Sequence, residues 1–118
     1  MQNHGKTGEE ILQEAREHVQ EMTCEEYKNT IRRQAHHLLL DVRTEKEFEE
    51  GHIDDAVNVP RGSLEFRIEE VAPNRNIPIM ICCATGRRAV LAAYTLQQMG
   101  YSDVRVLEGG FNEFCKLD

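Results

Sequence analysis

Residues 77–89 read IPIMICCATGRRA, and this stretch indicates how the chain folds. Its first half, Ile77–Cys82, is nearly all apolar, which is typical of a strand buried on both faces. After the loop comes a run of apolar residues at helical spacing, closed by Gly100. That run consists of Ala89, Ala92, Ala93, Leu96 and Met99. A buried strand that leads through a short loop into an amphipathic helix indicates an α/β protein.

The same alternation of strand and helix extends through most of the chain. Further short apolar runs occupy residues 38–42, 56–59 and 104–107. Capping boxes, in which a threonine is followed three residues later by a glutamate, predict helices after Thr7, Thr23 and Thr44. The expected helices span residues 8–18, 24–34 and 45–50. We therefore expect a parallel sheet of four or five strands covered by helices on both sides, with Met22 in a short extra edge strand.

The composition excludes several classes of protein. The 118 residues hold 14 Lys and Arg against 21 Asp and Glu, which gives a formal net charge of −7. An acidic chain of this length predicts one domain and disfavours a nucleic-acid partner. No apolar run approaches the ~18 residues of a membrane helix, so no membrane partner is expected. Because residues 1–20 are acidic and lack the apolar stretch of a signal peptide, we expect a cytoplasmic protein. We expect residues 1–20 to be an N-terminal helical extension.

The cysteine and histidine pattern does not predict a metal site. The four cysteines are Cys24, Cys82, Cys83 and Cys115. In a reducing compartment they are expected to be free thiols. No C-x-x-C pair is present, and His36 and His37 are expected to be solvated residues at a helix end because they lack metal-ligand spacing.

The loop after Cys82 carries the residues expected to do chemistry. In parallel sheets ligands bind at the carboxyl ends of strands, where Cys83 stands. The small residues of the loop allow backbone amides to turn inward as an anion-binding nest, and the following helix adds partial positive charge. Cys82 is expected to be a buried packing residue inside the strand. Cys83, beside a helix N-terminus and two arginines, is expected to be a nucleophilic thiolate.

Three motifs in this order resemble those of the rhodanese (sulfurtransferase) family, over about residues 22–114. Its first signature resembles residues 40–43 (LDVR), 47–48 (EF), 51–53 (GHI) and 56–60 (AVNVP). Residues 83–88, CATGRR, resemble the family's six-residue active-site loop, Cys-x-x-Gly-x-Arg. Residues 107–111, LEGGF, resemble its closing signature, and residues 60–66 resemble a single-domain branch.

The resemblance implies a rhodanese-like three-layer domain over residues 21–118 that works as a sulfurtransferase. Cys83 would take sulfane sulfur from thiosulfate or a persulfide donor, hold it as a persulfide and pass it to a thiophilic acceptor. The implied partners are a small anionic sulfur donor and a thiol or protein-cysteine acceptor, with no metal or organic cofactor. The substrate-binding residues would be Ala84, Thr85, Gly86, Arg87 and Arg88. Arg61, which follows a strand end, either reaches the pocket mouth or stays on the surface.

Two departures from the family pattern affect the expected activity. Ala89 stands where the family often has Ser or Thr, so one hydroxyl hydrogen bond to the loop is expected to be missing. Arg87 adds a second positive charge at the loop entrance, which favours an anionic donor or acceptor.

Two other functions remain open from the sequence. A cysteine-dependent phosphatase or arsenate-reductase-like enzyme on the same fold would use Cys82-x5-Arg88. Against this, Ile81 replaces the histidine common in those phosphatases, and Gly86 stands three residues after Cys83, as the six-residue loop requires. The second alternative is a persulfide carrier module with low turnover.

Charged residues outside the loop are expected to be structural. Asp41 and Arg43 are expected to form a hydrogen-bonded pair beneath the site. The acidic residues of the helix over 45–50 are expected to form a solvated face that complements the helix dipole. Those residues are Glu45, Glu47, Glu49 and Glu50.

Overall fold

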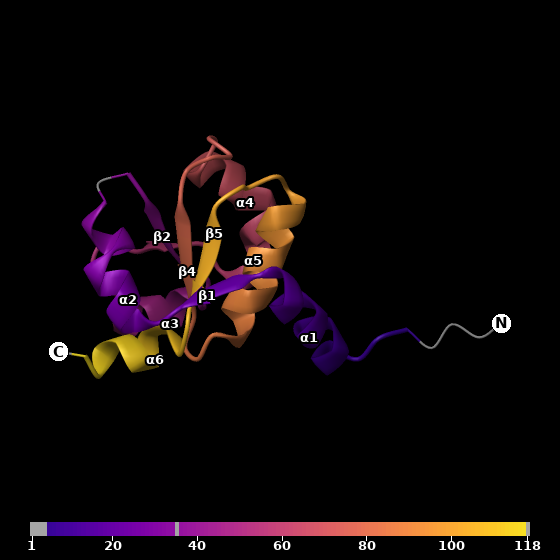
Figure 1. The fold of residues 1–118 in the computed structure, drawn as a ribbon, viewed down its shortest axis with the longest axis horizontal. Coiled ribbons are helices and arrows are strands. Elements are labelled where there is room, and N and C mark those ends of the chain that lie inside the picture. Colours follow the sequence, from indigo (N-terminus) through magenta and orange to yellow (C-terminus); the bar gives the residue numbers. More distant parts are fainter. Residues whose placement is uncertain (1–4, 35, 118) are drawn as a thin grey trace.

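The computed structural model describes residues 5–34 and 36–117, and it contains a five-stranded parallel sheet between two layers of helices (Figure 1). The strands are β1 (Gln20–Met22), β2 (Leu38–Asp41), β3 (Val57–Asn58), β4 (Ile79–Cys82) and β5 (Val104–Leu107). Their order across the sheet is β1-β5-β4-β2-β3, and each of the four neighbouring pairs is parallel. The predicted α/β architecture is confirmed, with Met22 in an edge strand. Because β4 is the central strand, the loop that follows it lies in the middle of the sheet's carboxyl edge.

Helices cover both faces of this sheet. They are α1 (Gly8–His18), α2 (Cys24–Asn29), α3 (Glu45–Glu50), α4 (Leu64–Val71), α5 (Arg87–Gln98) and α6 (Gly110–Cys115). Two short 3-10 helices occupy Ile31–Arg33 and Arg61–Ser63. Buried side chains of α1, α4 and α5 pack against one face, and those of α2 and α6 pack against the other. Figure 1 shows these two layers on either side of the strands.

The helix starts follow the sequence closely, but one predicted helix is broken. All three predicted capping boxes form, at Thr7, Thr23 and Thr44. The helix expected over residues 24–34 is wrong in its second half, because α2 ends at Asn29 and a 3-10 turn follows. At Thr30 the backbone leaves the helical region, and the Thr30 hydroxyl donates to the carbonyl of Glu26 at 2.6 Å. Such a bond competes with helix continuation.

Two further helices were not predicted. α4 has few apolar positions, since only Leu64 and Ile68 are buried while Phe66 is 84% exposed. α6 begins at Gly110, a residue type that more often ends helices. The strand predicted over residues 56–59 forms ladder pairs only at Val57 and Asn58. These differences have the same cause. The apolar pattern of these short segments is weak, and their structure depends on contacts with distant parts of the fold, which a local pattern does not contain.

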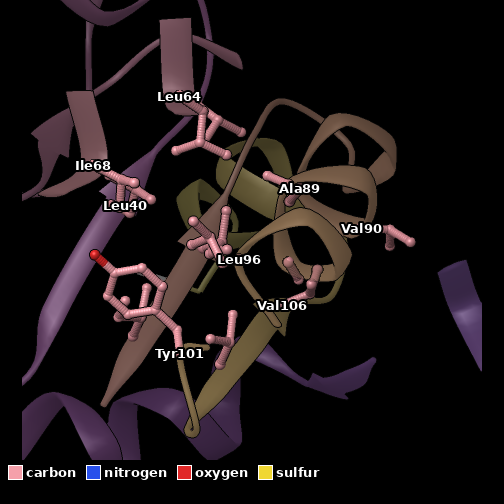
Figure 2. Close-up of a cluster of buried hydrophobic side chains, with 14 of the residues drawn as sticks. Leu40, Leu64, Ile68, Ala89, Val90, Leu96, Tyr101 and Val106 are labelled. Carbon is pink, nitrogen blue, oxygen red and sulfur yellow. The ribbon is translucent and has the colours of Figure 1, made fainter. Parts of the chain in front are cut away.

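The apolar strands send successive side chains to two separate clusters. Leu40 packs with Leu64, Ile68, Leu96 and Val106 on the face covered by α1, α4 and α5, as Figure 2 shows. The larger residues of the other face come from α2, β2, β4, β5 and α6. They include Tyr27, Leu39, Met80, Leu107 and Phe114. This alternation follows from the two-residue period of a strand.

The predicted N-terminal helix packs on the same core. Leu12 and Ala15 of α1 are buried in the cluster that contains α5 residues. The side-chain amide of Gln97 donates to the carbonyl of His18 at 3.0 Å, and the His18 ring stacks on Tyr94. The predicted boundary between an N-terminal extension and the domain, after residue 20, falls inside β1, which begins at Gln20. This division of the chain stays a prediction. Residues 1–4, 35 and 118 belong to the predicted ranges but lie outside the described residues.

In the described part of the chain, no helix has the length and apolar character needed to cross a lipid bilayer.

Candidate active site

The loop between β4 and α5 wraps around the sulfur of Cys83. The Cys83 Sγ accepts a hydrogen bond from the backbone amide of Gly86 at 3.0 Å and another from that of Ala89 at 3.4 Å. Gly86 adopts φ +110°, a conformation that side-chain-bearing residues rarely take, and this turns its amide back toward the sulfur. Gly86 falls inside the predicted substrate-binding range, 84–88, whereas Ala89 follows it. Two amide donors on one sulfur favour a negative charge at that atom.

The first residues of α6 hold the loop between β4 and α5 by backbone hydrogen bonds. The amides of Phe111 and Asn112 donate to the carbonyls of Cys83 and Ala84, at 2.8 and 3.2 Å. A Cβ on Gly110 would lie 2.1 Å from the Cys83 carbonyl oxygen, so only glycine allows this approach. Residues 107–111 were recognisable from the sequence as a motif, with the pair of glycines as the available signal, but their position against the loop was not predicted. Because these two carbonyls point toward α6, the loop amides are free to face the sulfur.

A buried ion pair lies beneath the loop, as predicted. Asp41 is 0% exposed and Arg43 is 5% exposed, and their closest approach is 2.8 Å between Oδ2 and Nη2. The Arg43 guanidinium also donates to the carbonyl of Gly51 and lies 4.3 Å from the centre of the Phe111 ring. The Asn58 side-chain amide donates to the carbonyls of Asp41 and Arg43. Arg43 therefore connects the chain segments of the first and third sequence motifs.

The last loop arginine is held by a carboxylate that the sequence analysis assigned to a solvated face. Arg88 donates to both carboxylate oxygens of Glu47, at 2.8 and 3.0 Å. Glu47 lies at the start of α3 and is partly exposed, as predicted, but its carboxylate is bound by Arg88 and is not only solvated. The hydrogen bonds from Arg88, followed by that from the Thr44 backbone, lower the pKa of Glu47 from 4.5 to about 2. Both side chains are about one-third exposed, so the pair joins the loop to α3 at the surface.

The other loop arginine points toward the N-terminal helix. Arg87 forms an ion pair of 3.2 Å with Glu9 of α1, and both side chains are more than 60% exposed. Thr85, which precedes this part of the loop, also faces α1 across a groove. The two predicted loop cations are thus directed to opposite neighbours, Arg88 to α3 and Arg87 to α1.

Arg61 lies against α4 and α5. Its guanidinium donates to Glu65 at 3.0 Å and to the hydroxyl of Thr95 at 3.1 Å. These contacts fix the side chain on the outer part of the α5 layer. A role for Arg61 in substrate binding stays a prediction.

Cys82 and Cys83 send their side chains to opposite faces of the sheet. Cys82 is 0% exposed and packs in the cluster that contains Leu39, Met80 and Leu107. Burial, with a smaller contribution from the Asp41 carboxylate, raises the pKa of the Cys82 thiol strongly. The predicted packing role of Cys82 agrees with this position, and a nucleophile at Cys82 does not.

The remaining cysteines belong to α2 and α6. Cys24 is buried, and its thiol donates weakly to the carbonyls of Glu108 and Gly110. Burial raises the pKa of Cys24. Cys115 is exposed on α6, and all four cysteines are free thiols. Within residues 5–34 and 36–117, no group of three or more His, Cys, Asp or Glu is placed to hold a metal ion.

Comparison with known proteins identifies a family and several relatives. The family model described as "Rhodanese-like domain" matches residues 23–117. The chain is 33% identical to thiosulfate sulfurtransferase 16, chloroplastic, of Arabidopsis thaliana, an alignment that covers 70% of this chain and 77% of that protein. It is also 33% identical to YrkF of Bacillus subtilis (strain 168), which is named as a candidate sulfur carrier. That alignment covers 84% of this chain but spans only 52% of YrkF.

A solved structure resembles nearly the whole chain. It is a protein of unknown function from Rhodopseudomonas palustris CGA009, described as a possible tyrosine phosphatase. The two chains are 26% identical with a TM-score of 0.84, and the match covers 98% of this chain and 94% of that one. Because the family model begins at residue 23, this structure extends the resemblance into the N-terminal helix.

Proposed function

The chain belongs to the rhodanese-like domain family, and from that membership we propose that it transfers sulfane sulfur through a persulfide on Cys83. The single observation that carries the proposal is the pair of hydrogen bonds from Gly86 N and Ala89 N to the Cys83 Sγ. Amide donors stabilise an anionic sulfur without supplying a proton that would quench it. Relatives named as sulfurtransferases support sulfur transfer as the general activity.

In the first half-reaction the Cys83 thiolate attacks the outer sulfur of thiosulfate. The sulfur–sulfur bond of thiosulfate breaks, sulfite leaves with the bonding electron pair, and Cys83 becomes a persulfide anion. The loop amides of residues 84–88, together with that of Ala89, would face the terminal sulfur. Arg87 and Arg88 would attract the dianionic donor to a chain that is acidic overall.

In the second half-reaction an acceptor attacks the terminal sulfur of the persulfide. The bond between that sulfur and the Cys83 Sγ breaks, and the cysteine thiolate is regenerated. Cyanide would give thiocyanate, and a thiol or a protein cysteine would give a new persulfide. In the first half-reaction one sulfur–sulfur bond replaces another, and in the second the broken sulfur–sulfur bond is replaced by a sulfur–carbon bond to cyanide or a sulfur–sulfur bond to the thiol. The cycle therefore needs no external oxidant.

The departure at position 89 affects the rate in this scheme. Ala89 contributes its amide to the sulfur but has no hydroxyl to add a further hydrogen bond. Turnover with thiosulfate is therefore expected to be lower than in a relative with Ser or Thr there. A strongly reduced turnover with intact sulfur loading would identify the chain as a persulfide carrier.

The test is intact mass after incubation with thiosulfate, combined with a thiocyanate assay. We expect the wild type to gain the mass of one sulfur and to form thiocyanate from cyanide. Cys83→Ser should lose both properties, while the matched variant Cys82→Ala should keep them. Wild-type protein that takes up no sulfur would contradict the proposal.

The same samples distinguish the phosphatase alternative, which the description of the Rhodopseudomonas palustris structure keeps relevant. Hydrolysis of an aryl phosphate that disappears in Cys82→Ala, without sulfur loading, would favour a loop that begins at Cys82. The burial of Cys82 on the opposite face of the sheet supports the Cys83 assignment instead.

A further inference from the structure

A cavity of about 350 Å³ lies on the face of the sheet that is covered by α2 and α6. Its walls come from α2, from the 3-10 turn after it, from the start of β2 and from the turn before β3. In Figure 1, α2 lies on the opposite side of the strands from α5. None of the described residues that line this cavity belongs to the loop between β4 and α5. The cavity is therefore separate from the candidate active site.

Hydrogen bonds hold the back wall of this cavity in place. The Tyr27 hydroxyl lies 2.9 Å from Nε2 of His37, and Nδ1 of the same ring lies 2.7 Å from the carbonyl oxygen of Gln34. Because a carbonyl only accepts, Nδ1 donates to it, and Nε2 of the neutral ring accepts from the hydroxyl. Tyr27 and Leu39 are 1% and 4% exposed and form an apolar floor. The cavity is thus formed before any ligand arrives.

Two arginines line the cavity without a carboxylate partner. The Arg32 guanidinium lies 4.9 Å from the centre of the Phe114 ring, a contact that uses none of its N–H groups. Arg33 is exposed. Across residues 5–34 and 36–117, neither side chain donates a hydrogen bond or forms an ion pair. Their N–H donors are therefore available to a carboxylate, for which a guanidinium has matching geometry.

Two aspartates line the cavity from the turn before β3. Asp54 and Asp55 lie between Ile53 and Ala56, whose carbonyl and amide close the turn at 3.0 Å. Asp55 has φ +70° and is the one non-glycine residue with a positive φ in the described part of the chain. Glycine would adopt this conformation with less strain. No hydrogen bond or ion pair of the Asp55 carboxylate to a described residue offsets the strain, and such strained residues concentrate at ligand sites.

The cavity therefore presents unpaired charges of both signs. Within the described residues, no ion pair joins Arg32 or Arg33 to Asp54 or Asp55, although all four line the same space. Both signs of charge act on the Tyr27 hydroxyl. Burial is the main cause of its raised pKa, Arg32 opposes that shift, and Asp55 adds to it. Small-molecule sites in proteins occupy about 300–1,000 Å³, a range that includes this cavity.

We propose that this cavity binds a small zwitterion of the α-amino acid class. The carboxylate of the ligand would meet Arg32 and Arg33, its ammonium group would meet Asp54 and Asp55, and its side chain would face Leu39. A simple anion would meet two carboxylates there, and a simple cation would meet two guanidinium groups, so each is disfavoured relative to the zwitterion. The inference does not depend on sulfur transfer, because the cavity shares no residue with the site around Cys83.

Leucine and two analogues that each lack one charge isolate the two contributions. The analogues are 4-methylpentanoate, without the ammonium group, and 3-methylbutan-1-amine, without the carboxylate. Full-length ¹⁵N-labelled protein is titrated with each probe at pH 7 and low salt, and the amide chemical shifts are followed. We expect L-leucine to bind with a Kd of about 1 mM, and each analogue to bind about fivefold more weakly. The shift changes should concentrate on residues 32–34 and 53–56.

Substitutions that remove one charge should act on the probes with opposite signs. Asp55→Asn keeps a side chain that tolerates positive φ, and it should weaken L-leucine about fivefold while it strengthens 4-methylpentanoate. Arg33→Gln should weaken L-leucine by a similar factor while it strengthens 3-methylbutan-1-amine. The matched controls are Glu70→Gln and Arg67→Gln, which remove the same charges at exposed positions of α4 that do not line this cavity. These controls should leave all three affinities near their wild-type values.

The outcomes separate this inference from the proposed function. The absence of localised shifts at about ten times the expected Kd would overturn the cavity proposal. Equal affinities for the three probes, or equal effects of the cavity and α4 variants, would overturn it as well. Cys83→Ser should bind L-leucine like the wild type, and loss of binding in that variant would assign the ligand to the loop instead. Failure of the wild type to load sulfur would contradict the proposed function and leave this inference intact.

Discussion

Cys82 and Cys83 are adjacent, and they are 0% and 1% exposed, but their surroundings differ completely. Cys82 faces apolar side chains from α2, α6 and the strands, where burial raises its pKa. Cys83 receives two backbone amides within 3.4 Å. Burial alone therefore does not distinguish Cys82 from the proposed nucleophile, Cys83. The direction of nearby backbone amides does, and that direction depends on the loop and on what supports it.

The largest expected effect comes from breaking the support on the Cys83 side. Gly110→Ala combines a positive φ of 62° with a Cβ placed 2.1 Å from the Cys83 carbonyl oxygen. We expect a loss of about 3 kcal/mol in unfolding free energy and loss of most sulfur loading. Urea unfolding and intact mass would measure the two effects.

Gly100→Ala is the matched control for that substitution. Gly100 also has a positive φ, but a Cβ there meets nothing within 4 Å. Its cost should be about 1 kcal/mol, with sulfur loading unchanged. Equal effects from both variants would show that the contact between Gly110 and the loop has no special role.

A smaller loss of stability is expected when Cys82, which faces the opposite cluster, is replaced. Cys82→Ala removes a buried sulfur from the cluster around Met80 and Leu107 and leaves a small cavity. We expect a loss of about 1.5 kcal/mol in unfolding free energy, while sulfur loading per folded molecule stays within about twofold. A selective loss of loading without destabilisation would mean that Cys82 takes part in the chemistry.

The ionisation of Tyr27 tests whether a negative charge is disfavoured in the buried cluster that also contains Cys82. Its hydroxyl bonds the Nε2 of His37 at 2.9 Å, so this histidine is not simply solvated as the sequence analysis expected. Tyr27→Phe should cost about 1 kcal/mol through loss of that bond. Burial raises the pKa of Tyr27 from 10.0 to about 12 in the folded protein. The stability that Tyr27 contributes is therefore present below pH 10 and is lost as the pH rises toward about 12.

The measurement for Tyr27 is the tyrosinate absorbance of wild type minus that of Tyr27→Phe, followed against pH. The difference should have its midpoint near pH 12 if the protein stays folded. A midpoint near 10.0, the ordinary value, would show that this face is accessible to water.

The smallest effect is expected at the ion pair that joins the loop to α3. Glu47→Gln removes the charge that Arg88 binds but keeps an oxygen for the capping box at Thr44. Because both partners are partly exposed, the loss at neutral pH should be about 0.5 kcal/mol.

The pH dependence of that loss has a definite sign. The pKa of Glu47 is lowered from 4.5 to about 2, so its stabilisation is present above pH 4.5 and disappears as the pH falls toward 2. Unfolding measurements should give wild-type and Glu47→Gln stabilities that differ at pH 7 and converge as the pH approaches 2. A difference that persists at low pH would mean that the variant acts through packing and not through charge.

Local sequence features predicted much of this fold. The capping boxes place helix starts because a Thr hydroxyl and a Glu carboxylate satisfy amides within one helical turn. The apolar run before Cys82 predicted a strand buried on both faces, and the two-residue period of a strand explains why Cys82 and Cys83 belong to opposite clusters. Position 83, at the strand end and before two arginines, was identifiable as the candidate nucleophile from the same stretch.

The residues that surround this candidate nucleophile come from distant parts of the chain. Glu47 reaches Arg88 across 41 residues, and α1 brings Glu9 to Arg87 across 78. The amides that hold the loop carbonyls belong to Phe111 and Asn112. A local pattern reports the turn or strand in which a residue lies, because those interactions join near neighbours. Only the folded sheet, which brings the ends of distant strands to one edge, decides which amides, carboxylates and helices surround Cys83.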